Sequence, residues 1–328
     1  MSMDRLIEKI VATQNPTVVG LDPKLDYIPG YIKEAAFAQY GYTLEGAAAA
    51  FLQFNKDIID AVCDIVPAIK PQAAYYEALG WQGVKCLYET ILYAHSKRMF
   101  VITDGKRNDI GSTMEAYADA HLGTTRVGEE IIAPFNGDAL TVNGYLGTDG
   151  IKPLLDICNR YDKGIFVLAK TSNPSSGELQ DREIDGEPVY HYMCRMCESW
   201  GESTYSKYGY SAVGAVAGAT YPEQLAILRK DMPHTFFLIP GYGAQGGGAA
   251  GLVGGFDERG LGGIVNSSRG IICAWKKSGR PETEHALAAS SSVPFMAIMP
   301  RGATRSLGSK IASLVDLNDI TIASSCFI

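Results

Sequence analysis

The hydrophobic positions of this chain are gathered in short apolar runs, each followed by a longer stretch in which apolar residues recur with helical spacing. Short apolar runs rich in β-branched residues are typical of buried parallel strands. Eight such runs occur, at residues 17–21, 66–69, 99–103, 139–142, 164–169, 212–217, 235–239 and 263–265. Helical spacing lies between them at 44–63, 77–97, 113–132, 186–207 and 221–230.

This alternation predicts an α/β protein with a (β/α)8 TIM-barrel fold in a single domain, spanning residues 1–279. A doubly wound sheet is the alternative, but it requires a GxGxxG turn after the first strand, and Gly20-Leu-Asp-Pro-Lys24 does not supply one. Residues 280–328 are rich in Ser and Ala, contain three prolines and lack a sustained helical period. We expect them to form an atypical tail in place of a closing helix, and both disorder and an altered reading frame are open interpretations of it.

Ionisable residues follow the predicted strands at the edge where α/β barrels bind their ligands. Asp22 follows the first strand, Lys70 the second, Asp104 and Lys106 the third, and Asn143 the fourth. An unpaired buried charge is costly, so lysines at the ends of buried strands need partners. We therefore expect Lys70 and Lys106 to pair with aspartates, either for catalysis or in a purely structural network.

The most informative stretch is Asp104-x-Lys106-x-x-Asp109. Two carboxylates flank one ammonium and keep it protonated, because each anion favours the charged form of the lysine. Such a lysine is suited to give a proton to a carbon that is becoming a carbanion. A solvated charged loop is the alternative interpretation of this motif taken by itself.

A glycine-rich loop, residues 240–248, follows the seventh predicted strand and is the candidate phosphate site. Glycines such as Gly243 allow close backbone approach and leave N–H groups free to face an anion, and Gln245 adds an amide donor. Arg269, after the eighth strand, suits bidentate binding of phosphate. Phosphate sites in barrels often lie after strands seven and eight. A flexible lid with a surface arginine is the alternative.

The loop after the fifth predicted strand carries three neutral polar residues, Thr171, Ser172 and Asn173. They suit the carbonyl and imide edge of a heterocycle better than a metal ion or a carboxylate, and turn chemistry alone is the alternative. The segment beyond, 175–182, is expected to be a mobile surface loop.

Composition narrows the class of protein. The chain has 328 residues, 46% of them hydrophobic, and a net charge of -7, which fits a globular enzyme and argues against a nucleic-acid surface. No run is long enough to cross a membrane. Seven scattered cysteines and a charged first segment favour the cytoplasm. His191, Cys194 and Cys197 have helical spacing, and we interpret them as helix packing because a zinc site needs a second ligand pair.

Taken together, these motifs resemble those of orotidine 5′-phosphate decarboxylase, in the longer bacterial branch of that family. The resemblance runs from Asp4 to Lys277 and rests on the residues described so far together with the Leu-Asp-Pro, Thr-Val-Asn, Thr-Ser-Asn-Pro and Ser-Ser-Arg-Gly motifs. The longer branch usually has Ala where Gly105 stands and Gly where Asn108 stands. Neither departure changes a charged position, so activity is expected.

The resemblance implies decarboxylation of orotidine 5′-monophosphate to uridine 5′-monophosphate, the last step of de novo pyrimidine biosynthesis, by a carboxy-lyase that uses neither a cofactor nor a metal. Lys70, Asp104, Lys106 and Asp109 match the family's charged catalytic residues. Lys106 is expected to protonate C6 of the pyrimidine as carbon dioxide leaves.

The resemblance also implies a homodimer whose active sites are shared, with Asp109 and Thr113 supplied by the partner subunit. Ribose hydroxyls are expected at Asp22, Lys70 and Thr113, and the pyrimidine edge at Ser172. The remaining candidates are Asn143 for substrate binding and, for the 5′-phosphate, Gly243, Gln245 and Arg269.

Two rival functions follow from the same motifs. Sister barrels act on sugar phosphates as magnesium-dependent enzymes, and their second strand typically carries a glutamate that helps to bind the metal. Lys70 stands at that position here and repels a cation. A non-catalytic nucleotide-binding relative is also disfavoured, because all four charged positions are present.

Overall fold

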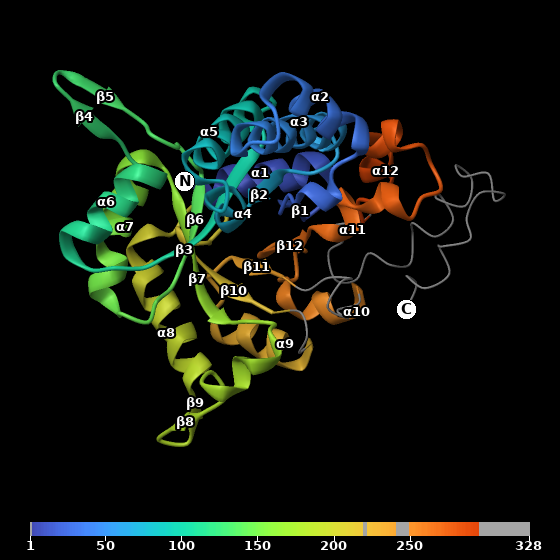
Figure 1. The fold of residues 1–328 in the computed structure, drawn as a ribbon. Coiled ribbons are helices and arrows are strands. Elements are labelled where there is room, and N and C mark those ends of the chain that lie inside the picture. Colours follow the sequence, from blue (N-terminus) through green and yellow to red (C-terminus); the bar gives the residue numbers. More distant parts are fainter. Residues whose placement is uncertain (1, 219–221, 241–248, 295–328) are drawn as a thin grey trace.

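The computed structural model describes residues 2–218, 222–240 and 249–294. Eight parallel strands close into a barrel in the order β1-β12-β11-β10-β7-β6-β3-β2, so neighbours in the barrel are also neighbours along the chain (Figure 1). They are β1 Thr17–Leu21, β2 Ala68–Pro71, β3 Phe100–Arg107, β6 Ala139–Val142, β7 Gly164–Lys170, β10 Val213–Ala217, β11 Phe237–Ile239 and β12 Gly263–Ser267. Each predicted apolar run contributes one strand, and the TIM-barrel prediction is confirmed.

Helices cover the outside of the barrel (Figure 1). They are α1 Ser2–Thr13, α2 Gly30–Tyr40, α3 Leu44–Val62, α4 Ala73–Glu77, α5 Gly80–Ser96, α6 Gly111–His121, α7 Thr148–Tyr161, α8 Val189–Gly201, α9 Pro222–Asp231, α10 Ala249–Leu252, α11 Arg269–Ile272 and α12 His285–Ser291. Four of the five predicted helical stretches are confirmed as α3, α5, α8 and α9. Cys194 and Cys197 lie buried in the core face of α8, which confirms their interpretation as helix packing.

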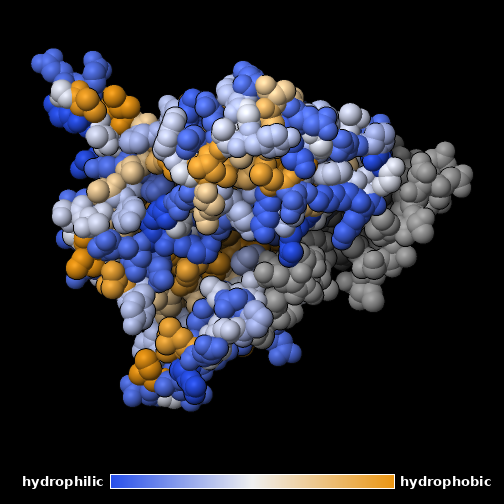
Figure 2. Space-filling model, viewed as in Figure 1, coloured by the Kyte–Doolittle hydropathy of each residue, from blue (hydrophilic) through white to orange (hydrophobic). Residues whose placement is uncertain are grey.

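The fifth helical prediction, 113–132, is wrong in its second half. Helix α6 ends at His121, and β4 Thr125–Val127 then pairs antiparallel with β5 Glu130–Ile132. Gly128 makes the turn with a φ of 63°, a conformation that glycine adopts without strain. The β4–β5 hairpin projects away from the barrel (Figure 1), and Figure 2 shows apolar side chains on it.

Helix α1 closes the amino-terminal end of the barrel. Its apolar face, including Met3, Leu6 and Ile7, joins one buried cluster with barrel residues such as Val18 and Phe100. Helical spacing of apolar residues places that face on one side of α1. The opposite end of the barrel is thus the end at which polar strand termini are left to form a site.

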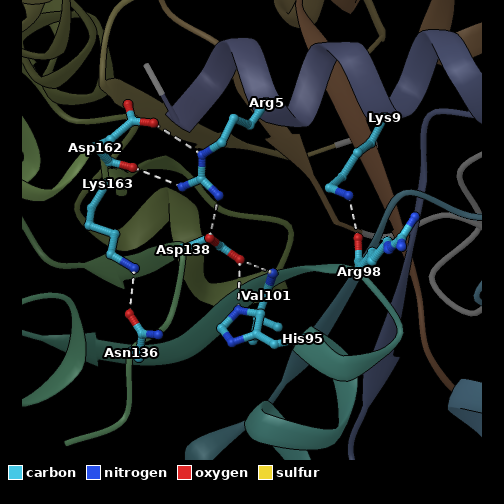
Figure 3. Close-up of polar contacts among 9 residues, drawn as sticks. All are labelled: Arg5, Lys9, His95, Arg98, Val101, Asn136, Asp138, Asp162 and Lys163. Carbon is cyan, nitrogen blue, oxygen red and sulfur yellow. Dashed lines mark hydrogen bonds and ion pairs between the residues drawn. The ribbon is translucent and has the colours of Figure 1, made fainter. Parts of the chain in front are cut away.

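A polar cluster fastens α1 to the barrel (Figure 3). Arg5 donates to Asp138 Oδ1 at 2.8 Å and to Asp162 Oδ2 at 3.1 Å. The other oxygen of Asp138 lies 3.0 Å from His95 Nε2 and accepts the Val101 N–H at 2.9 Å. Burial opposes the charged form of Asp138, but the His95 hydrogen bond and the Arg5 charge outweigh it and lower its pKa to about 2.

The chain after residue 280 contains a short helix, so the expected lack of a helix after the eighth strand is wrong for residues 285–291. A 3-10 turn, Glu282–Glu284, leads into α12, which packs against α3. The buried His285 ring stacks on Phe54 at 5.6 Å and lies 3.3 Å from Asp57 Oδ2. Residues 295–328 of the predicted tail lie outside the described residues.

In the described part of the chain, no helix is both long and apolar enough to span a membrane.

Candidate active site

Asp104 is the centre of the charged cluster predicted at the strand ends. It lies on β3, and its Oδ2 accepts hydrogen bonds from Lys70 Nζ at 2.6 Å and Gln72 Nε2 at 3.0 Å. Its Oδ1 accepts from Lys106 Nζ at 2.6 Å and from the Thr141 hydroxyl at 2.7 Å. One buried carboxylate thus holds two ammonium groups from neighbouring strands, as the sequence predicted for this pair of lysines.

The electrostatics of the cluster favour the charged forms of Asp104 and Lys70. Burial opposes ionisation of Asp104, but the charges of Lys70 and Lys106 outweigh it and lower its pKa well below the ordinary range. Burial disfavours a charged Lys70, but Asp104 and then Asp22 outweigh it and raise the pKa of Lys70. The cluster therefore holds a persistent ammonium group at neutral pH.

Lys106 differs from Lys70 in exposure and backbone. The Lys106 side chain is 48% exposed, whereas that of Lys70 is 7% exposed. Its φ of 47° is the left-handed conformation, which is strained for a residue with a Cβ and is often found at functional sites. A Cβ at the preceding Gly105 would lie 3.3 Å from Leu140 Cδ1, so an alanine at this position fits after a small shift. Lys106 is the ammonium group presented at the barrel mouth.

Sequence reasoning missed two functional residues, Gln72 and Thr141. The Gln72 amide anchors Asp104 Oδ2, and the Thr141 hydroxyl donates to Asp104 while accepting the Lys106 N–H at 3.0 Å. Thr141 is part of the Thr-Val-Asn motif of the resemblance but was given no role. Both are neutral, so charge patterning does not reveal them. The available signal was their position at the ends of β2 and β6.

Asp22 lies beside this cluster at the end of β1. Its Oδ1 is buried and accepts no hydrogen bond from the described residues, although its charge acts on Lys70. A buried carboxylate oxygen without a donor is costly. Nearby, a Cβ on Gly20 would lie 1.8 Å from Ser268 Oγ, so glycine is required where β1 and the end of β12 approach. Asp22 is thus free to accept a hydroxyl donor from a ligand.

Asp109 and Thr113 do not join the cluster within one chain. Asp109 Oδ1 accepts the Ile110 N–H at 2.8 Å, and no ion pair joins Asp109 to another described residue. Thr113 is exposed on the first turn of α6. Within one chain, therefore, the Lys70–Asp104–Lys106 part of the predicted catalytic set is assembled and Asp109 is not.

The other predicted binding residues have varied surroundings. Asn143 Oδ1 accepts the Tyr145 N–H at 3.0 Å, a local hydrogen bond that stabilises a turn. Ser172 is half-buried just after β7, and Arg269 is exposed at the start of α11 without an ion pair to the described residues. Gly243 and Gln245 lie outside the described residues.

Comparison with known proteins identifies the site's relatives. The sequence profile of the orotidine 5′-phosphate decarboxylase / HUMPS family matches residues 19–279. The orotidine 5′-phosphate decarboxylase of Rhodopirellula baltica is 47% identical over 268 residues, 82% of this chain and 87% of that relative. That of Caldicellulosiruptor saccharolyticus is 40% identical over 83% of this chain and 90% of its own length. The solved OMP decarboxylase of Leishmania donovani, 30% identical, superposes with a TM-score of 0.66 over 88% of this chain and 94% of that one.

Proposed function

Because the chain belongs to the orotidine 5′-phosphate decarboxylase / HUMPS family, we propose that it decarboxylates orotidine 5′-monophosphate to uridine 5′-monophosphate, the last step of UMP biosynthesis. The observation that carries this proposal is Asp104 held between two ammonium groups, with Lys106 at the barrel mouth. This cluster supplies a positive charge in a low-dielectric site, where it stabilises developing negative charge strongly.

The reaction breaks the bond between C6 and the carboxylate carbon, and carbon dioxide leaves. The electron pair stays on C6, and Lys106 Nζ gives its proton to that carbon to form the C6–H bond. Solvent then returns a proton to Lys106. Because Asp104 holds the Lys106 ammonium in place before reaction, no reorganisation is needed as charge develops. Asp104 also repels the substrate carboxylate when the nucleotide is bound.

Residues around the cluster suit the other parts of the nucleotide. Asp22 Oδ1, to which no described residue donates, and the adjacent Lys70 suit ribose hydroxyls. Arg269 is exposed and has no ion pair with the described residues, so its guanidinium suits the 5′-phosphate, together with Gly243 and Gln245 of the glycine-rich loop. Ser172 suits the pyrimidine edge. Phosphate binding does no chemistry itself, but its binding energy contributes to closing the site over the reacting end.

The sugar-phosphate reaction of sister enzymes is disfavoured by the donor set. Both oxygens of Asp104 are occupied by ammonium, amide and hydroxyl donors, and Lys70 stands where a metal-binding carboxylate is needed. A divalent cation would meet two ammonium groups here, and the Asp104 carboxylate is already paired with both of them. We therefore propose a reaction that needs no metal and no cofactor.

We propose that the protein is a homodimer in which Asp109 and Thr113 complete the partner's site. Asp109 has no charged partner among the residues that the structure describes, which supports a role across an interface. Exposed apolar side chains follow β3 and β6 in the chain: Ile110, next to Asp109, is 51% exposed and Tyr145 is 75% exposed. The β4–β5 hairpin adds Ile131, which is 62% exposed. A two-stranded hairpin is only marginally stable alone in water, so packing against a second copy of the chain would stabilise it.

The described cysteines are all free thiols, which supports the cytoplasm as the compartment in which the protein works.

The test is the loss of pyrimidine absorbance after orotidine 5′-monophosphate is added to the purified protein, with and without a metal chelator. We expect turnover at the same rate in both. Turnover abolished by the chelator would contradict the metal-free site, and a folded protein that leaves the nucleotide unchanged would contradict the proposed function.

A further inference from the structure

Two adjacent residue pairs join the two ends of the loop that follows β7. Lys170, the last residue of β7, lies 2.5 Å from Asp181 Oδ1. The next residue, Thr171, donates its N–H to Gln180 Oε1 at 2.9 Å, and its hydroxyl accepts from Gln180 Nε2 at 2.7 Å. Two consecutive residues at the strand end thus hold two consecutive residues at the far end of the loop. We call these four residues the β7 clasp.

Because Lys170 is buried, its ion pair with Asp181 holds the end of the loop against the barrel. The Lys170 side chain is 1% exposed, whereas that of Asp181 is 43% exposed. The ammonium also lies 5.2 Å from the centroid of the Tyr190 ring. A buried ammonium is costly unless it is paired, so the chain segment that carries Asp181 is held where Lys170 requires it. The expected mobile loop at 175–182 is instead attached to the barrel at its end.

The clasp holds Ser172, which directly follows Thr171. On its other side the Ser172 backbone abuts Gly218, where an added Cβ would lie 3.1 Å from Ser172 N. The Thr171 hydroxyl also donates to Asn173 Oδ1 at 2.6 Å, and the 3-10 turn Pro174–Glu178 follows. Ser172 is therefore fixed by Gly218 on one side and by the bonds of its two neighbours.

We propose that the β7 clasp positions Ser172 for the pyrimidine edge and thereby sets the affinity of the site for the base end of the nucleotide. Lys170, Gln180 and Asp181 are positioning residues that act through the loop. This inference rests on the proposed function, because it takes Ser172 as a contact to the base. It assigns a role to Lys170, Gln180 and Asp181, which lie outside the charged catalytic set and were not singled out in the sequence.

The test compares Gln180→Leu with Gln180→Glu and with Glu178→Gln, an exposed neighbour on the same loop that serves as the control. Gln180→Leu removes both bonds to Thr171, whereas Gln180→Glu keeps an acceptor for the Thr171 N–H. The first readout is hydrogen exchange at the Thr171 amide. We expect faster exchange in Gln180→Leu and wild-type exchange in the control.

The second readout is the dissociation constant of two ligands, UMP and ribose 5-phosphate, which lacks the base. Two neutral hydrogen bonds are lost in Gln180→Leu, so we expect UMP affinity to fall about tenfold. Ribose 5-phosphate affinity is expected to stay unchanged, because the sugar and phosphate contacts lie elsewhere. Gln180→Glu is expected to recover most of the UMP affinity.

The outcomes separate this inference from the function on which it rests. Equal weakening of both ligands in Gln180→Leu would show a merely structural role and overturn the inference, as would unchanged UMP affinity. A wild-type protein that binds neither ligand would overturn the proposed function and the inference together.

Discussion

The Thr141 hydroxyl donates a 2.7 Å hydrogen bond to Asp104 Oδ1 and so joins β6 to the charged cluster on β3. The same hydroxyl accepts the backbone N–H of Lys106 at 3.0 Å. A single neutral side chain thus bonds both to the Asp104 carboxylate and to the strained backbone at Lys106, the proposed proton donor.

We expect Thr141→Val to lower kcat about tenfold or more while the protein stays folded. Valine has the same shape but leaves the Lys106 N–H and one Asp104 oxygen without this partner, which costs on the order of 1–3 kcal/mol. Steady-state kinetics with a thermal melt as control checks this. An unchanged kcat would mean that Lys106 is held in place by Asp104 alone.

Subunit complementation tests the shared site. Lys106→Ala and Asp109→Ala are each expected to be inactive as pure proteins. In a mixed dimer, one site has both defects and the other has neither. If chains exchange freely, about a quarter of wild-type activity is expected to return after mixing, because half of the dimers are mixed and each has one intact site.

No recovery from that mixture, with exchange of subunits demonstrated by differently tagged chains, would place each active site within a single chain. Asp109, which lies apart from Lys106 in its own chain, would then have no role in either active site.

Substitution of Ile131 tests the hairpin as part of the dimer interface. We expect Ile131→Ser to weaken dimerisation roughly tenfold or more, because loss of a buried apolar side chain costs about 1.5–3 kcal/mol. The control is Ile227→Ser, on α9 and 49% exposed. Sedimentation velocity over a range of protein concentrations measures the shift. Equal dimerisation of the two variants would exclude the hairpin from the interface.

The barrel itself was predictable because buried parallel strands are short apolar runs, which the sequence displays openly. The charged cluster was predictable because Lys70 and Asp104 follow such runs. The β4–β5 hairpin was not, because residues 113–132 are compatible with either helix or strand, and Gly123 was the available break in the pattern. Gln72 carries no charge, so its contact with Asp104 appears only once β2 and β3 are adjacent.

Helix α12 was missed for a different reason. It has 7 residues, too few for a helical period to show and too few to be stable alone. Its stability comes from tertiary contacts, above all the buried His285 against Phe54 and Asp57. No local propensity predicts such contacts.

The Arg5–Asp138 pair at the closed end of the barrel is expected to stabilise the fold independently of the active site. Because folding lowers the pKa of Asp138 to about 2, its contribution is present above about pH 4, the ordinary range of the carboxyl, and is lost as pH falls towards 2. Asp138→Asn is expected to lower the free energy of unfolding on the order of 3 kcal/mol at neutral pH.

Urea unfolding of wild type and Asp138→Asn across this pH range checks both statements, with the exposed Asp156→Asn as control. The difference between wild type and Asp138→Asn is expected to shrink as pH falls through this window. A constant difference would show that the charge of Asp138 does not carry the effect.

The most direct test of the central claim is turnover and ligand binding by Lys106→Ala, with Lys152→Ala on the exposed face of α7 as control. Our account predicts that Lys106→Ala still binds UMP but loses turnover about a thousandfold or more, since it lacks the proton donor and the charge that stabilises the carbanion. Lys152→Ala is expected to match wild type. Turnover by Lys106→Ala close to that of wild type would contradict the account.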